Sequence, residues 1–412
     1  MMRDAPDGAA AVVDAAIVGA GPAGAATAVR LRALGLTVAL LDKEQFPRHK
    51  ICGDFLPPGA VANVRSLCGE VVEAAAPARL TGLRITWRGR SILADFPPDT
   101  AGWGLSRLQL DALLVKRAVA AGADLVERFR VERTVRLEDG RHRVEGSHPD
   151  GTRRAFVASL VVEAGGRFGL VGRRLGWRRD DVRLQRWALW SPLSGVEGLS
   201  ARCEMHVIDG GYVGVAPLPG EKTANVTMVL SPRRMAAARS DPRGYYRHVL
   251  GEHAELGPRL DAAHSVAPVR GLGPLACRAR RFSEEGIALV GDACGFVDPF
   301  TAEGVSRALE SARMLGDAVA PHTAAGRPLP ASLTLPSYES AWRERFGPKL
   351  ALCRMLQVVI ARPWLAGPMA RGLSRRKDLA NLMIAATGDL LPAASVMNPS
   401  YVGRLLIAGA IG

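Results

Sequence analysis

A glycine-rich turn between an apolar strand and a small-residue helix constrains the fold of this chain more than any other feature. Residues 14–18 form a short apolar run, Gly19–Gly24 follow it, and an Ala/Leu-rich helix is predicted next. A dinucleotide pyrophosphate requires backbone N–H groups close to it and a helix N-terminus aimed at its charge. Gly19 permits the tight turn, Gly21 lets the backbone approach phosphate, and Gly24 lets the helix pack on the strand.

An acidic residue completes this βαβ unit. Gly35 ends the predicted helix, residues 37–41 form the second predicted strand, and Asp42 stands at its end. A carboxylate in that position accepts hydrogen bonds from the ribose hydroxyls of an adenosine. A solvated strand end is the alternative interpretation of Asp42. The strand, turn, helix and acid together favour a dinucleotide site.

A second segment favours FAD over NAD. The predicted buried strand at residues 287–290 ends just before Asp292, and a further helix is predicted to begin at Gly304 and Val305. An acid past the strand can hold a ribityl hydroxyl, and amides at a helix start can stabilise negative charge at the N1/O2 edge of a flavin. NAD has neither a ribityl chain nor such an edge. Helix capping by the aspartate is the alternative.

The rest of the chain suggests an interrupted domain. Residues 80–98 and 182–230 lack helical periodicity and have strand-like alternation, whereas residues 107–121 have helical spacing of leucines. We therefore predict an α/β fold. Its parts are a discontinuous Rossmann-like FAD-binding domain (12–75, 104–180 and 281–325), a β-rich substrate domain (76–103 and 181–280), a linker (322–334) and a helical C-terminal region (331–412).

Charge and cysteine usage exclude several classes of protein. The net charge is +14, but the arginines that cause it are scattered and have no aromatic stripe among them, which argues against nucleic-acid binding. The six cysteines are far apart and form no C-x-x-C pair, so neither a metal site nor a disulfide framework is predicted. The N-terminus lacks the pattern of a signal peptide, and no apolar run reaches membrane-spanning length. We expect a cytoplasmic protein.

These motifs resemble the geranylgeranyl-reductase-like branch of the flavoproteins that share the class A monooxygenase fold. The matching stretches are Gly19–Gly24, Phe46-Pro47-Arg48-His49-Lys50-Ile51-Cys52-Gly53, Arg107 with Asp111, Val161–Leu175 and Gly291–Val305. The resemblance implies that Arg48, Cys52 and Gly53 lie near the flavin and that Arg107 contacts the cofactor. It also places Asp292 and Pro299 beside the ribityl chain and the ring. The predicted cofactor-binding residues are Gly19, Ala20, Gly21, Pro22, Ala23, Gly24, Asp42, Lys43, Arg48, Cys52, Gly53, Arg107, Asp292, Pro299, Gly304 and Val305.

Three departures from the family pattern bear on function. The middle motif Ala-Asp-Gly is replaced by Glu163-Ala164-Gly165, and Glu163 is expected to supply a structural hydrogen bond. Residues 212–217 (Tyr-Val-Gly-Val-Ala-Pro) lack the Trp and Phe that similar prenyl reductases carry there, which predicts a wider pocket and a bulkier ring or polyketide-like substrate. Halogenases that resemble this fold carry a Trp-x-Trp-x-Ile-Pro stretch and a lysine some tens of residues after the first glycine motif. Residues 187–192 (Trp-Ala-Leu-Trp-Ser-Pro) have a different tryptophan spacing, and no lysine lies between positions 50 and 116, so halogenation is not expected.

The resemblance implies an FAD-dependent oxidoreductase that acts on a lipophilic isoprenoid or polyketide-derived small molecule. Two reaction types stay open, namely C=C reduction (or the reverse desaturation) and hydroxylation through a flavin hydroperoxide. No second glycine motif follows a strand, so a separate nicotinamide domain is not predicted. The reductant of FAD is then transient NAD(P)H, an electron-carrier protein or the substrate itself, and NAD(P)H is the one we expect. The alternative class is a non-catalytic FAD- or nucleotide-binding protein. Oligomeric state is left open.

Two residues are candidates for direct chemical roles. Cys52 belongs to the flavin-side motif, and the alternative is that it is buried as a small apolar residue. Tyr212 could orient a substrate or donate a proton, and the alternative is that it packs on a sheet.

The C-terminal apolar stripes at Leu350–Ile360 and Leu379–Ile384 have two interpretations. They pack against the flavin domain, or, with the nearby basic residues 371–377, they form a face for peripheral membrane association.

Overall fold

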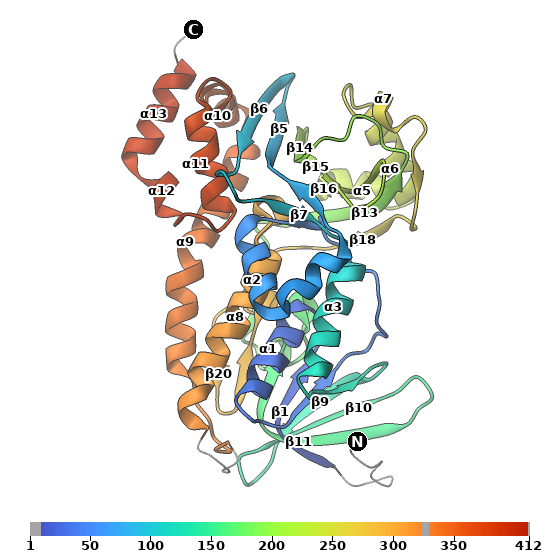
Figure 1. Cartoon of the computed structure of the whole chain (residues 1–412), viewed down its shortest axis with the longest axis vertical. Helices are drawn as coiled ribbons and strands as arrows, with labels where there is room; N and C mark the ends of the chain where they lie inside the picture. The colour runs from blue at the N-terminus through green and yellow to red at the C-terminus, as the bar shows by residue number, and fades with distance from the viewer. Residues whose placement is uncertain (1–9, 324–328, 411–412) are drawn as a thin grey trace.

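A largely parallel sheet forms the core of the lower half of the molecule in Figure 1. The structure is a computed structural model that describes residues 10–323 and 329–410. The sheet has the order β20-β21-β11-β1-β2-β8, in which β1 (Ala11–Val18) lies between β2 (Val38–Leu41) and β11 (Arg153–Glu163). β1 begins before the predicted strand, because its first residues pair with β11, a contact distant in sequence.

The parallel strands end at one edge of the sheet, and the predicted cofactor segments follow them there. The turn at Gly19 follows β1, Asp42 follows β2, and Gly291 comes just after β21 (Ile287–Leu289). Ligands of open α/β sheets bind at this edge. The covering helices are α1 (Pro22–Ala33), α3 (Arg107–Ala120) and α8 (Gly304–Val319), and α8 begins at Gly304, as the sequence predicts.

A second sheet, in the upper half of Figure 1, joins two segments that are far apart in sequence. Its order is β17-β13-β16-β15-β14-β5-β6, and the pairing of β5 (Gly82–Trp87) with β14 (Arg202–Ile208) is parallel. The remaining strands are β6 (Arg90–Asp95), β13 (Trp187–Ser194), β15 (Gly211–Pro217), β16 (Thr223–Leu230), β17 (His264–Ser265) and β18 (Arg270–Leu272). Helices α5 (Pro232–Ala238), α6 (Pro242–Gly251) and α7 (Gly257–Leu260) belong to the same half.

Strand alternation divides the side chains of β5 and β14 between the two faces of this sheet. Leu83 and Met205 point to the face that the C-terminal helices cover, and Arg84 and Glu204 point to the other. Because side chains alternate with a period of two, the first set is apolar and the second forms ion pairs. The apolar face is therefore available to build a cavity.

Five helices complete the chain: α9 (Pro336–Ile360), α10 (Pro363–Arg375), α11 (Lys377–Thr387), α12 (Ala394–Met397) and α13 (Pro399–Ala410). In Figure 1, α9 runs beside α8 toward the second sheet, where the other four gather. Lys349 of α9 is buried and forms an ion pair with the buried carboxylate of Asp389, which fixes α9 to the loop after α11. Among the described residues, no single helix is long and apolar enough to span a bilayer, although α9 and α10, bent by 109° at their junction, pass that test as a pair.

Four more strands belong to the first sheet, namely β8 (Asp124–Val126), β9 (Arg130–Arg136), β10 (His142–Ser147) and β20 (Ser283–Glu284). Two small sheets have the orders β3-β7-β4 and β12-β19-β22, in which the strands are β3 (Phe55–Leu56), β4 (Ala78–Leu80), β7 (Gly102–Gly104), β12 (Arg178–Asp180), β19 (Cys277–Ala279) and β22 (Gly295–Phe296). The remaining helices are α2 (Pro58–Cys68) and α4 (Val171–Arg174). The predicted fold class is confirmed: an α/β sheet domain is interrupted by a β-rich layer and followed by helices. Residues 324–328 of the predicted linker lie outside the described residues.

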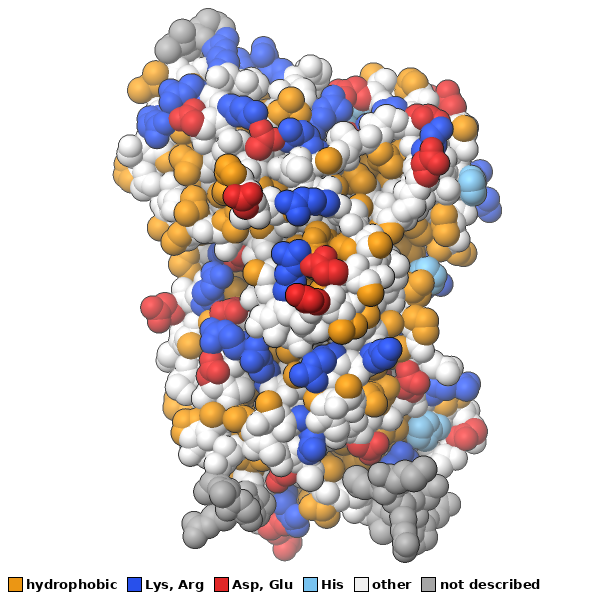
Figure 2. All heavy atoms as spheres, in the orientation of Figure 1, with side chains coloured by type: hydrophobic (Ala, Val, Ile, Leu, Met, Phe, Trp, Pro, Cys, Tyr) orange, Lys and Arg blue, Asp and Glu red, His pale blue; other side chains and the backbone are white. Residues whose placement is uncertain are grey.

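Basic side chains are spread over the visible surface. In Figure 2, Lys and Arg side chains lie over both halves of the molecule, with Asp and Glu side chains among them in many places. That face has no continuous basic stripe of the kind that tracks a nucleic-acid backbone.

Candidate active site

The glycine turn has the geometry that a pyrophosphate site requires. Gly19 has a φ of +106°, which favours glycine, and its N–H donates to the carbonyl of Leu41 at 2.7 Å. A Cβ atom on Gly24 would lie 1.8 Å from the carbonyl oxygen of Gly19, so only glycine fits there. The Ala20 N–H donates to Oδ2 of Asp42 at 2.7 Å, which ties the turn to the end of β2.

Two arginines lie in front of this turn. A Cβ atom on Gly21 would be 3.7 Å from Nη2 of Arg48 and 3.9 Å from Nη2 of Arg107. Both guanidinium groups donate to the fully buried carboxylate of Asp111, Arg107 at 2.6 and 2.8 Å and Arg48 at 3.0 Å. Burial alone would lower the pKa of Arg107, but the adjacent Asp111 carboxylate raises it. Asp111 therefore holds two cations beside the open backbone of Gly21.

The segment after β21 meets the glycine turn. Gly291 has a φ of +61°, and a Cβ atom on it would lie 2.9 Å from the Cβ of Ala23 in α1. The next residue, Asp292, is half-buried and accepts a hydrogen bond of 2.7 Å from the buried guanidinium of Arg307. The same guanidinium lies 3.8 Å from Glu303. Burial opposes ionisation of Arg307, but the Asp292 carboxylate raises its pKa.

These residues fit a bound dinucleotide. In the part of the chain that the structure describes, a Cβ atom on Gly53 or Gly304 would have no atom within 4 Å, so both backbones face open space. Among the same residues, the buried Nε atoms of Arg48 and Arg307 have no hydrogen-bond partner. Open backbone amides and incompletely paired guanidinium groups match the phosphates and hydroxyls of such a ligand, since buried polar atoms are usually paired.

A buried acid lies in the loop that holds Cys52. The Asn225 side chain donates to the carbonyl of Cys52 at 3.0 Å and to Oδ2 of Asp54 at 2.6 Å, and the Arg107 N–H donates to Oδ1 of Asp54 at 3.1 Å. Burial raises the pKa of Asp54 to about 7. Burial also raises the pKa of the Cys52 thiol, which the Arg107 cation opposes. Cys52 is therefore held between the arginine pair and β16.

Tyr212 lies deeper than the sequence suggests. It is buried, its ring packs edge-on against Phe300 with the centroids 5.1 Å apart, and its hydroxyl donates to Asp298. Burial, together with the Asp298 carboxylate, raises the pKa of Tyr212 well above its ordinary value. The hydroxyl thus has a partner already, and Phe300 stands beside it.

Glu163 lies just before the position at which the family motif carries its aspartate. It is fully buried at the end of β11 and accepts hydrogen bonds from the Gly165 N–H at 2.8 Å and the Val171 N–H at 2.6 Å. Burial raises its pKa. Glu163 thus organises the turn after β11, a structural hydrogen bond of the kind that the sequence predicts.

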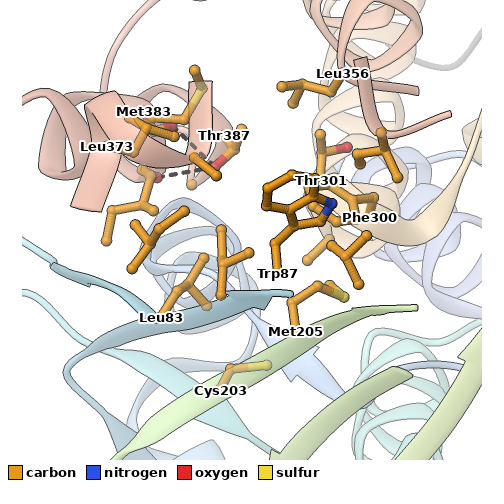
Figure 3. A pocket seen from close by; sticks show the side chains of 18 of the residues that line it. Leu83, Trp87, Cys203, Met205, Phe300, Thr301, Leu356, Leu373, Met383 and Thr387 are labelled. Atoms are coloured by element: carbon orange, nitrogen blue, oxygen red, sulfur yellow. Dashed lines mark hydrogen bonds between the residues drawn. The ribbon is translucent and has the colours of Figure 1, made fainter. Parts of the chain in front are cut away.

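An apolar cavity adjoins this site. It encloses about 1010 Å³, counting the space at its opening, and lies between the apolar face of β5 and β14 and the helices α9–α11. Figure 3 shows Trp87 rising from the sheet between Met205 and Leu356, with its indole next to Phe300 and Thr301. The turn Phe300–Ala302 lines the cavity and comes directly before the start of α8. The cavity therefore ends where the sequence places the flavin ring.

The cavity offers hydrocarbon contacts and few polar ones. Its two side-chain hydroxyls are already engaged: Thr387 donates to carbonyls of its own helix at 3.2 and 3.3 Å, and Thr301 donates to the sulfur of Cys353 at 3.6 Å. Burial raises the pKa of the Cys203 thiol in the wall to about 12, so it stays neutral. A ligand group that fills this space is favoured when it is apolar.

The match to a known family decides which cofactor the protein binds. Residues 12–332, most of the chain, match the FAD binding domain family. The chain belongs to that family. This FAD-dependent flavoprotein is also 28% identical over 399 residues to the menaquinone reductase of Mycolicibacterium smegmatis, with 92% of each chain covered. It is 28% identical over 352 residues to digeranylgeranylglycerophospholipid reductase 1 of Methanococcoides burtonii, with 82% of this chain and 81% of the relative covered.

Solved structures share the fold of this flavoprotein. A flavoprotein/dehydrogenase from Cytophaga hutchinsonii superposes with a TM-score of 0.81 at 18% identity, covering 96% of this chain and 97% of the other. A myxobacterial chondrochloren halogenase superposes with a TM-score of 0.78 at 20% identity, covering 97% and 96%. At such identities the similarity concerns the fold alone.

The structure brings most of the predicted cofactor residues together. The Gly19–Gly24 turn, Asp42, Arg48, Arg107 and Asp292 are linked by the contacts described above. We call these residues, with Gly304 and Val305 at the start of α8, the dinucleotide site. Lys43 is exposed, and its Nζ lies 3.7 Å from the carboxylate of its neighbour Glu44. Pro299 begins the short turn between Asp298 and α8.

Three residues of this region were missed by the sequence analysis. Arg307, Asp54 and Asn225 each form a buried polar contact in the site. A signal for Arg307 was present, since an arginine on an otherwise small and apolar face of a helix requires an acidic partner. Asp54 and Asn225 meet only through tertiary packing of β16 on the Cys52 loop, which no local pattern reports.

Proposed function

We propose that this flavoprotein reduces a C=C bond in the prenyl chain of a lipophilic isoprenoid. The observation that carries the proposal is the apolar cavity that ends at Phe300–Ala302, directly before the helix start where the flavin ring is proposed to lie. The printed names of two relatives agree with this substrate class, since one is a menaquinone reductase and the other a reductase of a digeranylgeranyl lipid.

In this proposal each part of the protein has a separate task. FAD, when bound, supplies the two-electron redox chemistry. Arg48 and Arg107 balance the charge of the pyrophosphate, Asp42 binds the adenosine ribose, and Asp292 binds the ribityl chain. The amides of Gly304 and Val305 stabilise negative charge at the ring edge. The cavity orients the chain and excludes water from the reacting bond.

Addition of a hydride to one carbon requires a proton for the other, and we propose Cys52 rather than Tyr212 as its source. Burial raises the pKa of the Cys52 thiol, so the proton is held on its Sγ atom at neutral pH. Tyr212 already donates its proton to Asp298 and lies beside Phe300, so we propose that it positions that turn. NAD(P)H is proposed as the transient reductant.

Product analysis under anaerobic conditions tests this function. The purified holoprotein, reduced by NADPH, is incubated without oxygen with a geranylgeranyl lipid that has no quinone ring, and the product is examined by mass spectrometry. We expect a product heavier by two hydrogen atoms. Cys52→Ser should slow its formation at least about tenfold, and Tyr212→Phe should have a smaller effect. A product that forms only with oxygen and carries an oxygen label would show hydroxylation instead.

A protein without bound flavin would contradict the enzymatic proposal altogether. An absorbance spectrum of the purified protein and an FAD titration detect that outcome. Halogenation is not proposed, since the chain has no lysine between Lys50 and Lys116, where similar halogenases carry one.

A further inference from the structure

The corner between α9 and α10 exposes large apolar side chains. Trp364, the second residue of α10, is 69% exposed, and Val358, near the end of α9, is 42% exposed. The neighbouring Ala361 and Pro363 are exposed as well. A tryptophan this exposed is unusual on a protein surface, because its large ring is normally well buried. Single exposed apolar residues need no explanation, but four within seven positions of one corner do.

The inner side of the same corner is a wall of the apolar cavity. Val359 and Ile360 line the cavity, as do Ala366 and Met369 on the next turns of α10. Val358 and Trp364 therefore lie on the outside of a wall only one helix thick, whose inside contacts the proposed substrate. No other part of the cavity lining has an exposed tryptophan next to it among the described residues.

The C-terminal helices carry an excess of basic side chains, although Arg376 and Arg404 pair with Asp378 and Lys377 pairs with Asp95 of β6. Residues 351–410 contain seven basic side chains, namely Arg354, Arg362, Arg371, Arg375, Arg376, Lys377 and Arg404, and two acidic ones, Asp378 and Asp389. Asp389 is buried and paired with Lys349, so Asp378 is the one acid of this set at the surface. A basic and apolar surface matches anionic lipid head groups above an acyl layer.

A neighbouring helix extends the apolar surface. Helix α13 packs against α10, where the Arg371 Nε donates to the carbonyl of Gly409 at 2.9 Å. On α13, Leu406 and Ile407 are exposed. In Figure 1 these two helices lie at the end of the molecule away from the nucleotide-binding sheet. Contact there would leave the dinucleotide site uncovered.

We propose that the corner Val358–Trp364 docks this flavoprotein on the surface of an anionic membrane. Trp364 lies at the boundary between head groups and acyl chains, a position that tryptophan favours. Docking brings the cavity wall formed by Val359 and Ile360 next to the lipid from which an isoprenoid enters. The delivery of substrate rests on the proposed function, whereas the docking itself does not.

Vesicle flotation of the holoprotein tests the docking. Vesicles of phosphatidylcholine alone are compared with vesicles that contain an equal part of phosphatidylglycerol, at low and at high salt. We expect binding to the anionic vesicles only, weakened by salt. The double variant Val358→Ser/Trp364→Ser should reduce the bound fraction about tenfold or more. Equal binding by this variant and the wild type, or no binding by the wild type, would overturn the proposal.

Matched controls separate docking from folding and from self-association. Val135→Ser changes a similarly exposed apolar residue on β9, at the opposite end of the molecule, and should bind vesicles as the wild type does. The flavin spectrum of each variant reports folding. Sedimentation velocity without vesicles should give the same species for all three proteins. If the double variant instead dissociated a dimer, the corner would belong to an interface between two copies, and membrane docking would be wrong.

Turnover distinguishes a failure of docking from a failure of the proposed reaction. The double variant should reduce a short-chain, water-soluble prenyl analogue at the wild-type rate but lose most of its activity on a substrate embedded in anionic vesicles. If the wild type reduced neither, the proposed function would be overturned while flotation would still decide on docking. Equal rates for both proteins on the embedded substrate would overturn delivery through this corner.

Discussion

The dinucleotide site and the apolar cavity meet at the turn before α8, yet they are built in different ways. The dinucleotide site consists of glycines, backbone amides and paired charges that follow successive parallel strands. The cavity consists of apolar side chains from β5, β14 and three C-terminal helices, which are far apart in sequence. In the first, a side chain added at Gly19 or Gly24 would collide with backbone atoms, which cannot move aside. The second requires only apolar side chains of suitable volume. Substitutions should therefore act very differently in the two regions.

The largest effect is expected at Gly24. A Cβ atom there would lie 1.8 Å from the backbone oxygen of Gly19, and no flexible side chain can move to relieve the contact. Gly24→Ala should displace the turn and abolish detectable FAD retention in the purified protein, as measured by flavin absorbance. Gly403→Ala in α13, where a Cβ atom would meet nothing within 4 Å, is the control and should retain FAD fully. A yellow Gly24→Ala protein would show that the turn is less constrained than described.

A pH dependence is expected from Asp54, which lies between the two regions. Burial raises its pKa from 3.8 to about 7, so between these values the folded protein holds a proton that the unfolded chain releases. The contribution of Asp54 to the free energy of unfolding should therefore be greatest below about pH 4. It should fall as the pH rises toward 7, by up to about 4 kcal/mol.

Denaturation of Asp54→Asn at several pH values measures this contribution. The variant should lose most of the decline that the wild type shows, because its side chain stays neutral. Asp209→Asn changes an almost fully exposed carboxylate and should leave the wild-type pH dependence intact. Identical pH profiles for Asp54→Asn and the wild type would mean that Asp54 is ionised in the folded protein.

A charge inside the cavity should harm substrate binding but not FAD binding. Met369→Glu places a carboxylate on the cavity side of α10, and desolvating it costs roughly 2–3 kcal/mol, which is about a 100-fold loss in kcat/KM. Ser374→Glu adds the same charge to an exposed position of the same helix and should be nearly neutral when the prenyl substrate is water-soluble and no membrane is present. If Met369→Glu lost its flavin, or retained full activity on a prenyl substrate, the cavity would not bind substrate independently of the dinucleotide site.

A smaller effect is expected at Asp292, where a single hydrogen-bonding group is altered and the backbone stays intact. Asp292→Asn removes the charge that pairs with Arg307 and weakens the proposed ribityl contact, which should raise the Kd for FAD about 10-fold. Asp317→Asn, at an exposed carboxylate of α8, should leave the Kd unchanged. Fluorescence titration of apoprotein with FAD measures both. An unchanged Kd for Asp292→Asn would show that the ribityl contact is elsewhere.

The sequence predicts the dinucleotide site far better than the cavity, for a physical reason. Gly19 and Asp42 follow neighbouring strands of one local βαβ unit, so their meeting at one sheet edge follows from that topology. Gly304 begins the helix after β21, which joins the sheet by a distant pairing with β11, and its place is predicted from the flavin motif instead. Leu83 and Met205 meet through a pairing of β5 with β14 that spans more than a hundred residues. Nothing in either strand specifies that partner.

The substrate side also shows where motif comparison falls short. Replacement of large aromatic residues by Gly214 and Ala216 predicts a wider pocket at that strand. In the structure, a Cβ atom on Gly214 would meet Met205 at 3.8 Å, and aromatic walls come from Trp87, Phe55 and Phe96 instead. The expectation of a bulkier substrate therefore stays a prediction. Tyr212 likewise shares a motif with a substrate wall but packs beside Phe300, outside the set of residues that line the cavity.

In the proposed function, electrons pass from flavin in the dinucleotide site to a lipophilic molecule in the apolar cavity. Anaerobic reoxidation of the reduced holoprotein tests it most directly. After reduction, a prenylated substrate is added without oxygen, and the flavin absorbance near about 450 nm is followed. We predict that the absorbance returns in proportion to the substrate added, and that Met369→Glu slows the return while Ser374→Glu does not. Reoxidation by oxygen alone, with no response to any prenylated substrate, would contradict the claim.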